Sequence, residues 1–349
     1  MPNGPAGASP SGRHPTDLTK MLSLRLHVVY FGTPSLPLHL PARAGYTLSK
    51  LFIRGCWMEF QPFTQSRDVI NQPDALRERM QRDGYLFISG LVPPEDARAV
   101  CEDILQICRE EGWADEEGFA IGEPRLEGHE GWWEVYDRLQ CLESFHALAH
   151  HPNILRVIEA IVQEPVLVHP RNIARITFPA TAHYTTPPHQ DYPLIQGTPD
   201  TYTVWIPLCD CPIELGGLAV LPGSHTLGLL PVHRASGPGG LSVNTSRWGD
   251  TWHAQDMQAG DALIFHSYTV HRALVNVSER RLRISVDYRY QGVSQPIVED
   301  GLRPHYERLS WDQIYQGWKR QDIQYYWQKY PLRIVPRDLT IMQPEEEYR

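Results

Sequence analysis

Three side chains suited to binding a transition metal stand out in the sequence: His189, Asp191 and His271. Two imidazoles and one carboxylate occupy one face of an octahedral metal ion and leave three positions open. Open positions for a co-substrate and dioxygen are what a non-heme Fe(II) oxygenase requires. Because His189 and Asp191 are two residues apart, an extended backbone would turn both side chains to the same face. Each histidine taken alone is more typical of a polar residue in a loop or at a strand end than of a metal ligand.

His271 has a sequence context that could bring it to the same metal. It follows residues 260–265, a Gly-Asp turn and an apolar run typical of a buried strand. Such a strand, facing the one that carries His189 and Asp191, could deliver His271 from the opposite side. The three residues together therefore predict one metal site.

Several arginines follow His271 on a predicted strand at residues 281–290. With alternating side chains, Arg281 and Arg283 share one face of this strand. A buried arginine beside a metal needs an anionic partner, and a dicarboxylate co-substrate supplies one that a planar guanidinium binds with two hydrogen bonds. The alternative is an exposed arginine ladder, which we expect for Arg280 but not for Arg283.

The secondary structure that must position these residues is expected to change from helices to strands near Pro165. Before it, helical periodicity dominates around one short apolar strand at residues 85–88. The expected helices span residues 74–83, 93–112, 132–150 and 154–162. After it, short runs rich in β-formers are separated by Pro, Gly and Asp. The expected strands span residues 166–169, 173–178, 202–206, 217–221, 262–265 and 281–290. We expect a mainly β fold with flanking helices and a sandwich or jelly-roll core.

Two further segments carry specific expectations. Residues 234–256 are rich in Gly and Ser and lack periodicity, which favours a functional lid over a plain connection. The aromatic-rich tail predicts helices at residues 311–318 and 324–330. Arg175 and Tyr184, near the first strands, are candidate substrate contacts.

Bulk properties narrow the class of protein. The 349 residues are 42% hydrophobic and 21% charged, which is ordinary for a globular enzyme. The net charge of −9 argues against nucleic acid as the main partner. No run approaches eighteen apolar residues, so we expect no membrane span. The six scattered cysteines favour reduced thiols and a cytoplasmic protein.

The first 57 residues differ from the rest. They contain six basic residues, one acid and seven prolines. A disordered or mis-called extension, with translation starting at Met58, is one interpretation, and an organelle transit peptide is another. We expect residues 1–57 to lie outside the fold, residues 58–335 to form one domain with its core at about 165–291, and residues 336–349 to form a tail.

The order of several motifs carries a family resemblance. The motifs are His189-Gln-Asp, residues 204–208 (Val-Trp-Ile-Pro-Leu), 214–218 (Glu-Leu-Gly-Gly-Leu), 221–225 (Leu-Pro-Gly-Ser-His), Gly260-Asp261, His271 and 276–278 (Asn-Val-Ser). From about Pro73 to Gln291 the chain resembles the phytanoyl-CoA dioxygenase family. Each motif alone is weak, but their combination in this order is specific. The resemblance implies a double-stranded β-helix (jelly-roll) core and an oxygenase that depends on Fe(II), 2-oxoglutarate and O2.

The resemblance also implies roles for single residues. His189, Asp191 and His271 correspond to the iron ligands, and Arg283 to the residue that binds the distal carboxylate of 2-oxoglutarate. The family usually places that arginine eleven residues after the second histidine, where this chain has Leu282. A loop one residue longer restores the register, and Arg281 is the alternative on the same face. Gln190 and Trp205 match positions that line the co-substrate pocket.

The carboxylate at position 191 narrows the expected reaction. Related halogenases lose it so that halide can bind the metal, and its presence here favours hydroxylation of a C–H bond. The expected partner is a small-molecule substrate, with neither nucleic acid nor membrane involved. A non-catalytic jelly-roll binding module and a cupin-type metal isomerase are the alternatives. The sequence selects neither the substrate nor the oligomeric state.

Overall fold

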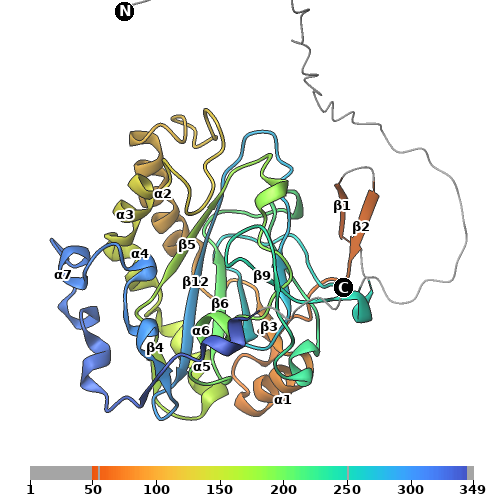
Figure 1. Cartoon of the computed structure of the whole chain (residues 1–349), viewed down its shortest axis with the longest axis vertical. Helices are drawn as coiled ribbons and strands as arrows, with labels where there is room; N and C mark the ends of the chain where they lie inside the picture. Colours follow the sequence, from red (N-terminus) through yellow and green to blue (C-terminus); the bar gives the residue numbers. More distant parts are fainter. Residues whose placement is uncertain (1–48, 54–55, 250, 344–349) are drawn as a thin grey trace, which may run out of the picture. The chain divides into compact units, whose positions relative to one another are not determined.

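A computed structural model of the protein describes residues 49–53, 56–249 and 251–343 (Figure 1). Its centre is a sheet of six strands in the order β3-β10-β6-β12-β4, with β5 also paired to β12. The strands are β3 (Tyr85–Ile88), β4 (Val166–Val168), β5 (Ile173–Thr177), β6 (Tyr202–Pro207), β10 (Ala262–His266) and β12 (Arg283–Gly292). All pairings in this sheet are antiparallel. The expected mainly β fold with flanking helices is confirmed.

The two faces of this sheet have different characters, as strand β12 shows. Its ten residues are all buried. Ile284, Val286 and Tyr288 belong to the apolar core on one face, whereas Arg283 and Asp287 alternate with them and occupy the other face. Buried charged side chains such as these require partners, so the second face of the sheet is a candidate position for a functional site.

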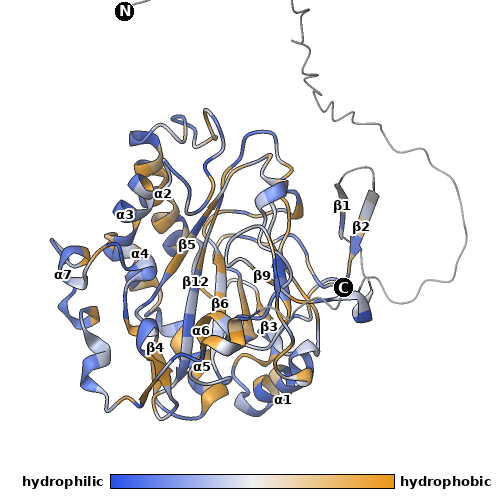
Figure 2. Ribbon diagram, in the orientation of Figure 1, coloured by the Kyte–Doolittle hydropathy of each residue, from blue (hydrophilic) through white to orange (hydrophobic). Residues whose placement is uncertain are grey.

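Helices cover the apolar face of the sheet. They are α1 (Pro73–Asp83), α2 (Pro94–Glu110), α3 (Trp133–Gln140), α4 (Glu143–Leu148) and α5 (Pro152–Val162). Figure 2 shows hydrophobic and hydrophilic residues mixed along each helix, as expected for helices that bury one face. The hydroxyls of Tyr288 and Tyr290 donate to the carbonyls of Phe145 and Ala149, which joins β12 to α4 and its end.

Helix boundaries follow local chemistry with one departure from expectation. Proline occupies the first turn of α1, α2 and α5, where its missing N–H costs nothing. Gly84 ends α1 in the left-handed conformation, with φ of 77°. The expected single helix over residues 132–150 is two helices, because Leu142 adopts an extended backbone between α3 and α4.

A small second sheet faces the polar side of the main sheet. It pairs β7 (Leu218–Val220) with β11 (His271–Ala273). One apolar cluster contains Trp205 and Phe265 from the main sheet together with Leu218 and Val220 from the small sheet. The fold is therefore layered as helices, main sheet and small sheet, and the second cluster lies between the two sheets.

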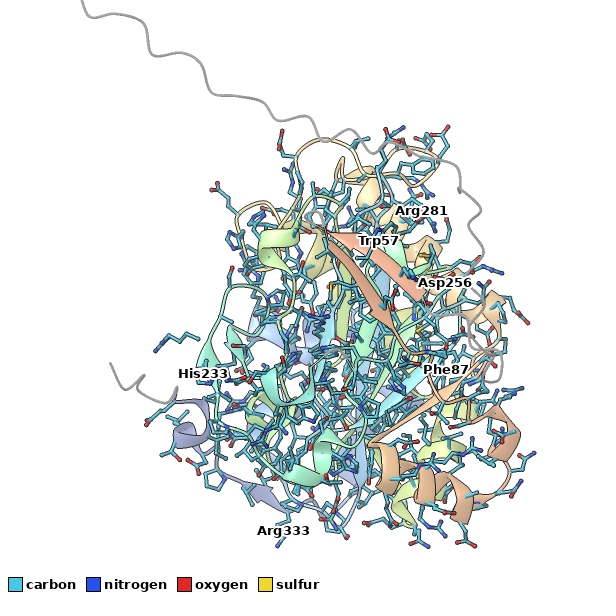
Figure 3. The ribbon with its side chains drawn as sticks, turned by 90° about the vertical axis from the view of Figure 1, so that its right-hand side faces the viewer. Trp57, Phe87, His233, Asp256, Arg281 and Arg333 are labelled. Carbon is cyan, nitrogen blue, oxygen red and sulfur yellow. The ribbon has the colours of Figure 1, made fainter. Side chains whose placement is uncertain are left out.

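The extension expected at residues 1–57 overlaps the first two strands of the structure. Strands β1 (Ser49–Ile53) and β2 (Cys56–Phe60) form an antiparallel hairpin, and Figure 3 views this side of the molecule with Trp57 labelled. Leu51 and Phe60 are buried in the cluster between the sheets, so the hairpin belongs to the fold. The expectations for residues 1–48 lie outside the described residues.

The remaining connections are more ordered than the sequence indicated. The segment expected as an aperiodic lid contains the hairpin β8 (His233–Arg234) and β9 (Leu241–Ser242), followed by a 3-10 turn. The aromatic tail forms one short helix, α7 (Trp311–Ile314), and 3-10 turns rather than two long helices. It ends by pairing β14 (Ile334–Val335) with β13 (Ile297–Val298). Among the described residues, no helix has both the length and the apolar character to cross a membrane.

Candidate functional site

The two histidines and the aspartate predicted from the sequence come together at the small sheet. His189 lies beside β11, where its backbone N–H and carbonyl form hydrogen bonds of 2.9 and 3.0 Å with the carbonyl and N–H of His271. Asp191 follows and immediately precedes the short helix α6 (Tyr192–Ile195). Its Oδ1 lies 3.6 Å from His189 Nε2 and 3.7 Å from His271 Nε2. The three ligand atoms lie within 4.8 Å of one another, which is the spacing of a group that could hold one metal ion.

The imidazoles of His189 and His271 each form a hydrogen bond through Nδ1, the ring nitrogen that points away from Asp191. His189 Nδ1 lies 2.8 Å from the Pro187 carbonyl oxygen, and His271 Nδ1 lies 3.0 Å from that of Thr269. A carbonyl only accepts, so both Nδ1 atoms carry the proton and both Nε2 lone pairs point to the cluster. Burial, reinforced by His189, lowers the pKa of His271 to about 4, so this imidazole is neutral at pH 7.

Asp191 has one oxygen engaged by protein and one directed at the imidazoles. Its Oδ2 accepts from Thr203 Oγ1 at 2.5 Å and contacts the Arg289 guanidinium at 3.4 Å. Burial alone would raise the pKa of Asp191, but the Arg289 guanidinium and the two histidines hold it well below its usual range. Since Oδ2 is occupied, the geometry favours binding of a metal through Oδ1 alone.

A cavity, part of it open to solvent, adjoins the three residues. Its walls come from both sheets. They consist of Arg175, Thr186, His189, Asp191, Thr203, Trp205, Leu218, Phe265, His271, Ala273, Arg283, Asp287 and Arg289. Charged and polar side chains make up most of this wall, and Trp205, Leu218, Phe265 and Ala273 supply its apolar part. Polar groups that converge on a cavity with aromatic walls are typical of a small-molecule site.

Arg283 lies in this cavity with unused hydrogen-bonding capacity. Its guanidinium donates to Ser285 Oγ at 2.8 Å and to Thr177 Oγ1 at 2.6 Å, and its central carbon lies 6.0 Å from the Trp205 ring centroid. No acidic side chain among the described residues forms an ion pair with it, and burial lowers its pKa. A buried cation without an acid partner is suited to bind an anionic ligand.

Of the other residues predicted to bind the co-substrate, Trp205 lies in the cavity wall, whereas Arg281 and Gln190 do not. Arg281 precedes β12, and its guanidinium donates to the Asp210 carbonyl at 2.9 Å; Figure 3 labels it at the outer part of the molecule. The Gln190 amide group donates to the carbonyls of Gly228 and Tyr268 and accepts from the Leu230 N–H. These hydrogen bonds connect Gln190 to two other loops, and its side chain does not line the cavity.

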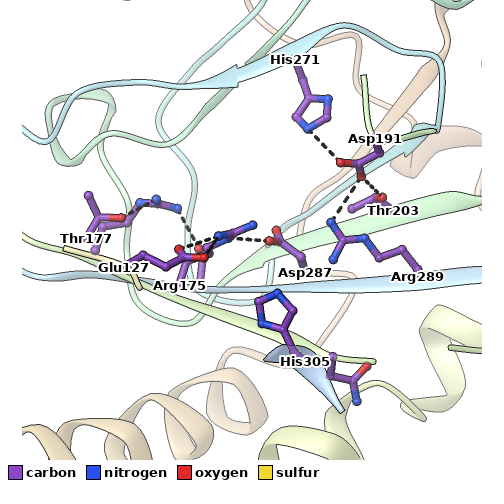
Figure 4. A network of polar contacts seen from close by, with 12 residues as sticks. Glu127, Arg175, Thr177, Asp191, Thr203, His271, Asp287, Arg289 and His305 are labelled. Carbon is purple, nitrogen blue, oxygen red and sulfur yellow. Dashed lines mark hydrogen bonds and ion pairs between the residues drawn. The ribbon is translucent and has the colours of Figure 1, made fainter. Parts of the chain in front are cut away.

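A second group of charges, which the sequence did not reveal as a unit, borders the cavity. Arg175 Nε donates to Asp287 Oδ2 at 3.0 Å, and its Nη1 donates to both carboxylate oxygens of Glu127 (Figure 4). Tyr184 does not line the cavity, and its hydroxyl donates to the Glu127 carbonyl. The only available signal was strand alternation, which places Asp287 on the face of Arg283 but says nothing of Glu127.

Comparisons with known proteins agree on one family. The family model described as phytanoyl-CoA dioxygenase (PhyH) matches residues 80–285. The 1-deoxypentalenic acid 11-beta-hydroxylase of Streptomyces arenae is 29% identical over 260 residues, covering 70% of this chain and 90% of that protein. Its counterpart from Streptomyces exfoliatus is 28% identical over 250 residues, covering 68% and 87%.

Solved structures that match part of this chain include SnoN and SnoK, both from nogalamycin biosynthesis. The epimerase SnoN, in complex with Fe3+, alpha ketoglutarate and nogalamycin RO, is 22% identical with a TM-score of 0.48 and covers 65% of this chain and 86% of that one. The non-heme alpha ketoglutarate dependent carbocyclase SnoK is 24% identical with a TM-score of 0.44 and covers 71% and 94%.

Proposed function

This chain belongs to the phytanoyl-CoA dioxygenase (PhyH) family, and we propose that His189, Asp191 and His271 hold its catalytic iron. The protein is an Fe(II)- and 2-oxoglutarate-dependent dioxygenase. It hydroxylates a C–H bond of a small molecule and releases succinate and CO2. The observation that carries the ligand assignment is the convergence of two imidazole Nε2 atoms and one carboxylate Oδ1 on a single point beside the cavity.

The donor set fits Fe(II) in type and in number. Two neutral imidazoles and one carboxylate form the facial triad of non-heme iron oxygenases. Thr203 and Arg289 engage Asp191 Oδ2, which keeps this carboxylate from occupying a second metal position. Fe(II) held by these three residues would supply the dioxygen chemistry that side chains alone do not supply.

For the co-substrate, we propose that Arg283 rather than Arg281 binds the distal carboxylate of 2-oxoglutarate. Arg283 lies in the cavity wall and has no acid partner among the described residues, whereas Arg281 lies outside the wall. Three residues of the wall also carry a buried N–H group that has no hydrogen-bond acceptor in the part of the chain that the structure describes: Trp205 Nε1, Arg283 Nε and Arg289 Nε. A dicarboxylate offers acceptors to such donors, so the residues present fit this co-substrate.

We further propose that the two facing sheets are the two halves of a double-stranded β-helix within a single catalytic domain. The antiparallel pairing and the cluster packed between the sheets support this topology. The domain would begin with the β1–β2 hairpin. A cytoplasmic location remains a prediction, and the five cysteines whose side chains are described form no disulfide.

Hydroxylation, rather than another oxidation, is supported by Asp191 and by the relatives. Asp191 supplies a metal ligand where a halogenase would need an open position for halide. The two Streptomyces relatives are named as hydroxylases of 1-deoxypentalenic acid, a small molecule. We therefore propose a small-molecule C–H bond as the target, with its identity set by the cavity beyond the co-substrate. Nothing in the site favours the alternatives of a binding module or a metal isomerase.

Succinate release tests this function directly. We expect purified protein with Fe(II), ascorbate, 2-oxoglutarate and O2 to form succinate slowly without substrate, and faster with a small molecule it hydroxylates. Omitting iron, or adding a chelator, should remove the activity. A protein that neither forms succinate nor binds 2-oxoglutarate when loaded with iron would contradict the proposal.

We predict that Thr203→Val weakens metal binding by about 10- to 100-fold, the effect expected for loss of a partner that orients a ligand. Thr203→Ser keeps the hydroxyl and should bind metal as the wild type does. Anaerobic calorimetric titration with Fe(II) or Mn(II) would measure the affinities. Thr201→Val is the matched control, because the Thr201 hydroxyl donates to the Thr198 carbonyl instead. Equal affinities for the Val variants would show that Thr203 does not orient Asp191.

A further inference from the structure

Asp287 is a buried carboxylate on the same face of β12 as Arg283. Arg283, Ser285 and Asp287 occupy every second position of the strand, so their side chains lie in a row on one face. The Arg283 guanidinium leans along the strand to Ser285 Oγ, and the next side chain on that face is Asp287, which is 7% exposed. The Asp287 charge acts on Arg283, where it opposes the lowering of the Arg283 pKa by burial, and such attraction is strong where water is largely excluded. An unopposed Asp287 would therefore compete for Arg283.

Asp287 is held by a different arginine. In the pairing of β5 with β12, Thr177 lies opposite Arg283 and Arg175 lies opposite Ser285. Directly opposed residues of an antiparallel pair have their side chains on the same face. Arg175 thus lies between Arg283 and Asp287, and its Nε donates to Asp287 Oδ2 at 3.0 Å (Figure 4).

Arg175 is in turn fixed from the other side. Its guanidinium contacts the Glu127 carboxylate, which comes from the connection between α2 and α3. The hydroxyl of Tyr306 donates to Glu127 Oε1 at 2.9 Å, and that of Tyr184 donates to the Glu127 carbonyl at 3.0 Å. The backbone of Tyr306 adopts a left-handed conformation, with φ of 63°, which non-glycine residues rarely do. Glu127 holds the Arg175 guanidinium, and Tyr184 and Tyr306 hold Glu127.

We propose that Arg175 is a positioning residue that keeps Asp287 from pairing with Arg283, and so leaves Arg283 free for the distal carboxylate of 2-oxoglutarate. The inference rests on the proposed function, because it assigns a role towards that co-substrate. Arg175 acts in two ways. It turns the Asp287 carboxylate towards β5, and its positive charge offsets the repulsion between that carboxylate and an incoming dianion.

The test measures 2-oxoglutarate binding to the anaerobic Fe(II)-loaded protein, by its visible absorption band or by quenching of tryptophan fluorescence. We expect Arg175→Leu to raise the Kd of 2-oxoglutarate by at least about tenfold, as expected when a buried charge loses its partner. Asp287→Asn introduced into this variant removes the competing carboxylate. The double variant should return to within about threefold of the wild-type Kd, a non-additivity expected of contacting residues.

Matched measurements separate this role from a general loss of structure. Arg138 also lies between two carboxylates, Glu110 and Glu111, but it is exposed and does not line the cavity, so Arg138→Leu should leave the Kd unchanged. Metal affinity and the thermal midpoint would be measured for every variant. Rescue by Asp287→Asn without a change in metal affinity is a result that a purely structural role of Arg175 does not produce.

Three results would overturn the role of Arg175, and a fourth would overturn the proposed function. Wild-type 2-oxoglutarate binding by folded Arg175→Leu would overturn the inference and leave the proposed function intact. So would a double variant that binds as weakly as Arg175→Leu, or an Arg138→Leu variant that is equally impaired. Failure of the iron-loaded wild type to bind 2-oxoglutarate would instead overturn the proposed function, and this inference with it.

Discussion

Asp191→Ala should abolish iron-dependent succinate formation, with a loss of at least about 10³-fold, since metal chemistry contributes several kcal/mol to such a reaction and 1.36 kcal/mol corresponds to a factor of ten. Asp191 supplies the only carboxylate of the three-residue cluster. Without it, two neutral imidazoles alone would have to retain a divalent ion. The Arg289 guanidinium, 3.4 Å from Asp191 Oδ2 in the native protein, would then face the metal position without an intervening anion. Both changes weaken metal binding.

The measurement is anaerobic metal titration together with succinate release. Asp200→Ala is the matched control, because it removes another aspartate paired with a histidine, His266 at 3.5 Å, but an exposed one. It should retain both metal affinity and activity. His271→Ala should resemble Asp191→Ala, since it removes a ligand of the same cluster. Retained iron-dependent turnover in Asp191→Ala would disprove the ligand assignment.

Strand periodicity made most of the main sheet predictable. A side chain on a strand has only two directions, so alternation in residues 283–290 was enough to place Arg283 and Asp287 on one face and Ile284 on the other. The metal cluster was predictable because two of its members are separated by one residue, although His189 lies at an isolated β-bridge and Asp191 at the start of α6 rather than on a strand. Their meeting with His271 depended on a pairing between remote segments, which the family resemblance indicated and periodicity did not.

Features that depend on tertiary contacts were missed. The hairpin of residues 49–60 follows a basic, proline-rich stretch, and only its packing of Leu51 and Phe60 into the core shows that it belongs to the fold. The break between α3 and α4 has neither Pro nor Gly to mark it in the sequence. Aromatic residues in the tail suggested helices, but they pack as short turns around Leu167.

Within the site, the errors concern where a side chain points from an irregular backbone. Gln190 lies between two cluster residues, but its side chain lies outside the cavity wall and contacts the Gly228 and Tyr268 carbonyls. Glu127 was not predicted because its partner Arg175 is 48 residues away and no periodic element joins them. Such contacts are set by loop conformation, on which a sequence pattern carries little information.

Arg283→Leu should raise the Kd and the KM for 2-oxoglutarate by about 10²-fold, because truncating one partner of a buried, hydrogen-bonded charge pair costs 2 to 5 kcal/mol. The guanidinium is the cation of the cavity wall that has no acid partner among the described residues, and leucine offers no donor to a carboxylate. Metal affinity should stay unchanged, since Arg283 contacts Thr177 and Ser285 rather than the metal cluster. Arg283→Lys should recover only part of the affinity, because an ammonium group cannot form the paired hydrogen bonds of a guanidinium.

Arg281→Leu is the decisive comparison. It removes an arginine only two residues away, from the position that the resemblance left as the alternative, but its guanidinium donates to the Asp210 carbonyl outside the cavity wall. We expect its Kd for 2-oxoglutarate to lie within about threefold of the wild type, the range of a residue outside the interface. A larger effect for Arg281→Leu than for Arg283→Leu would reverse the assignment. Because Asp191→Ala should lose the metal and Arg283→Leu only the co-substrate, metal titration of the two variants separates the two halves of the site.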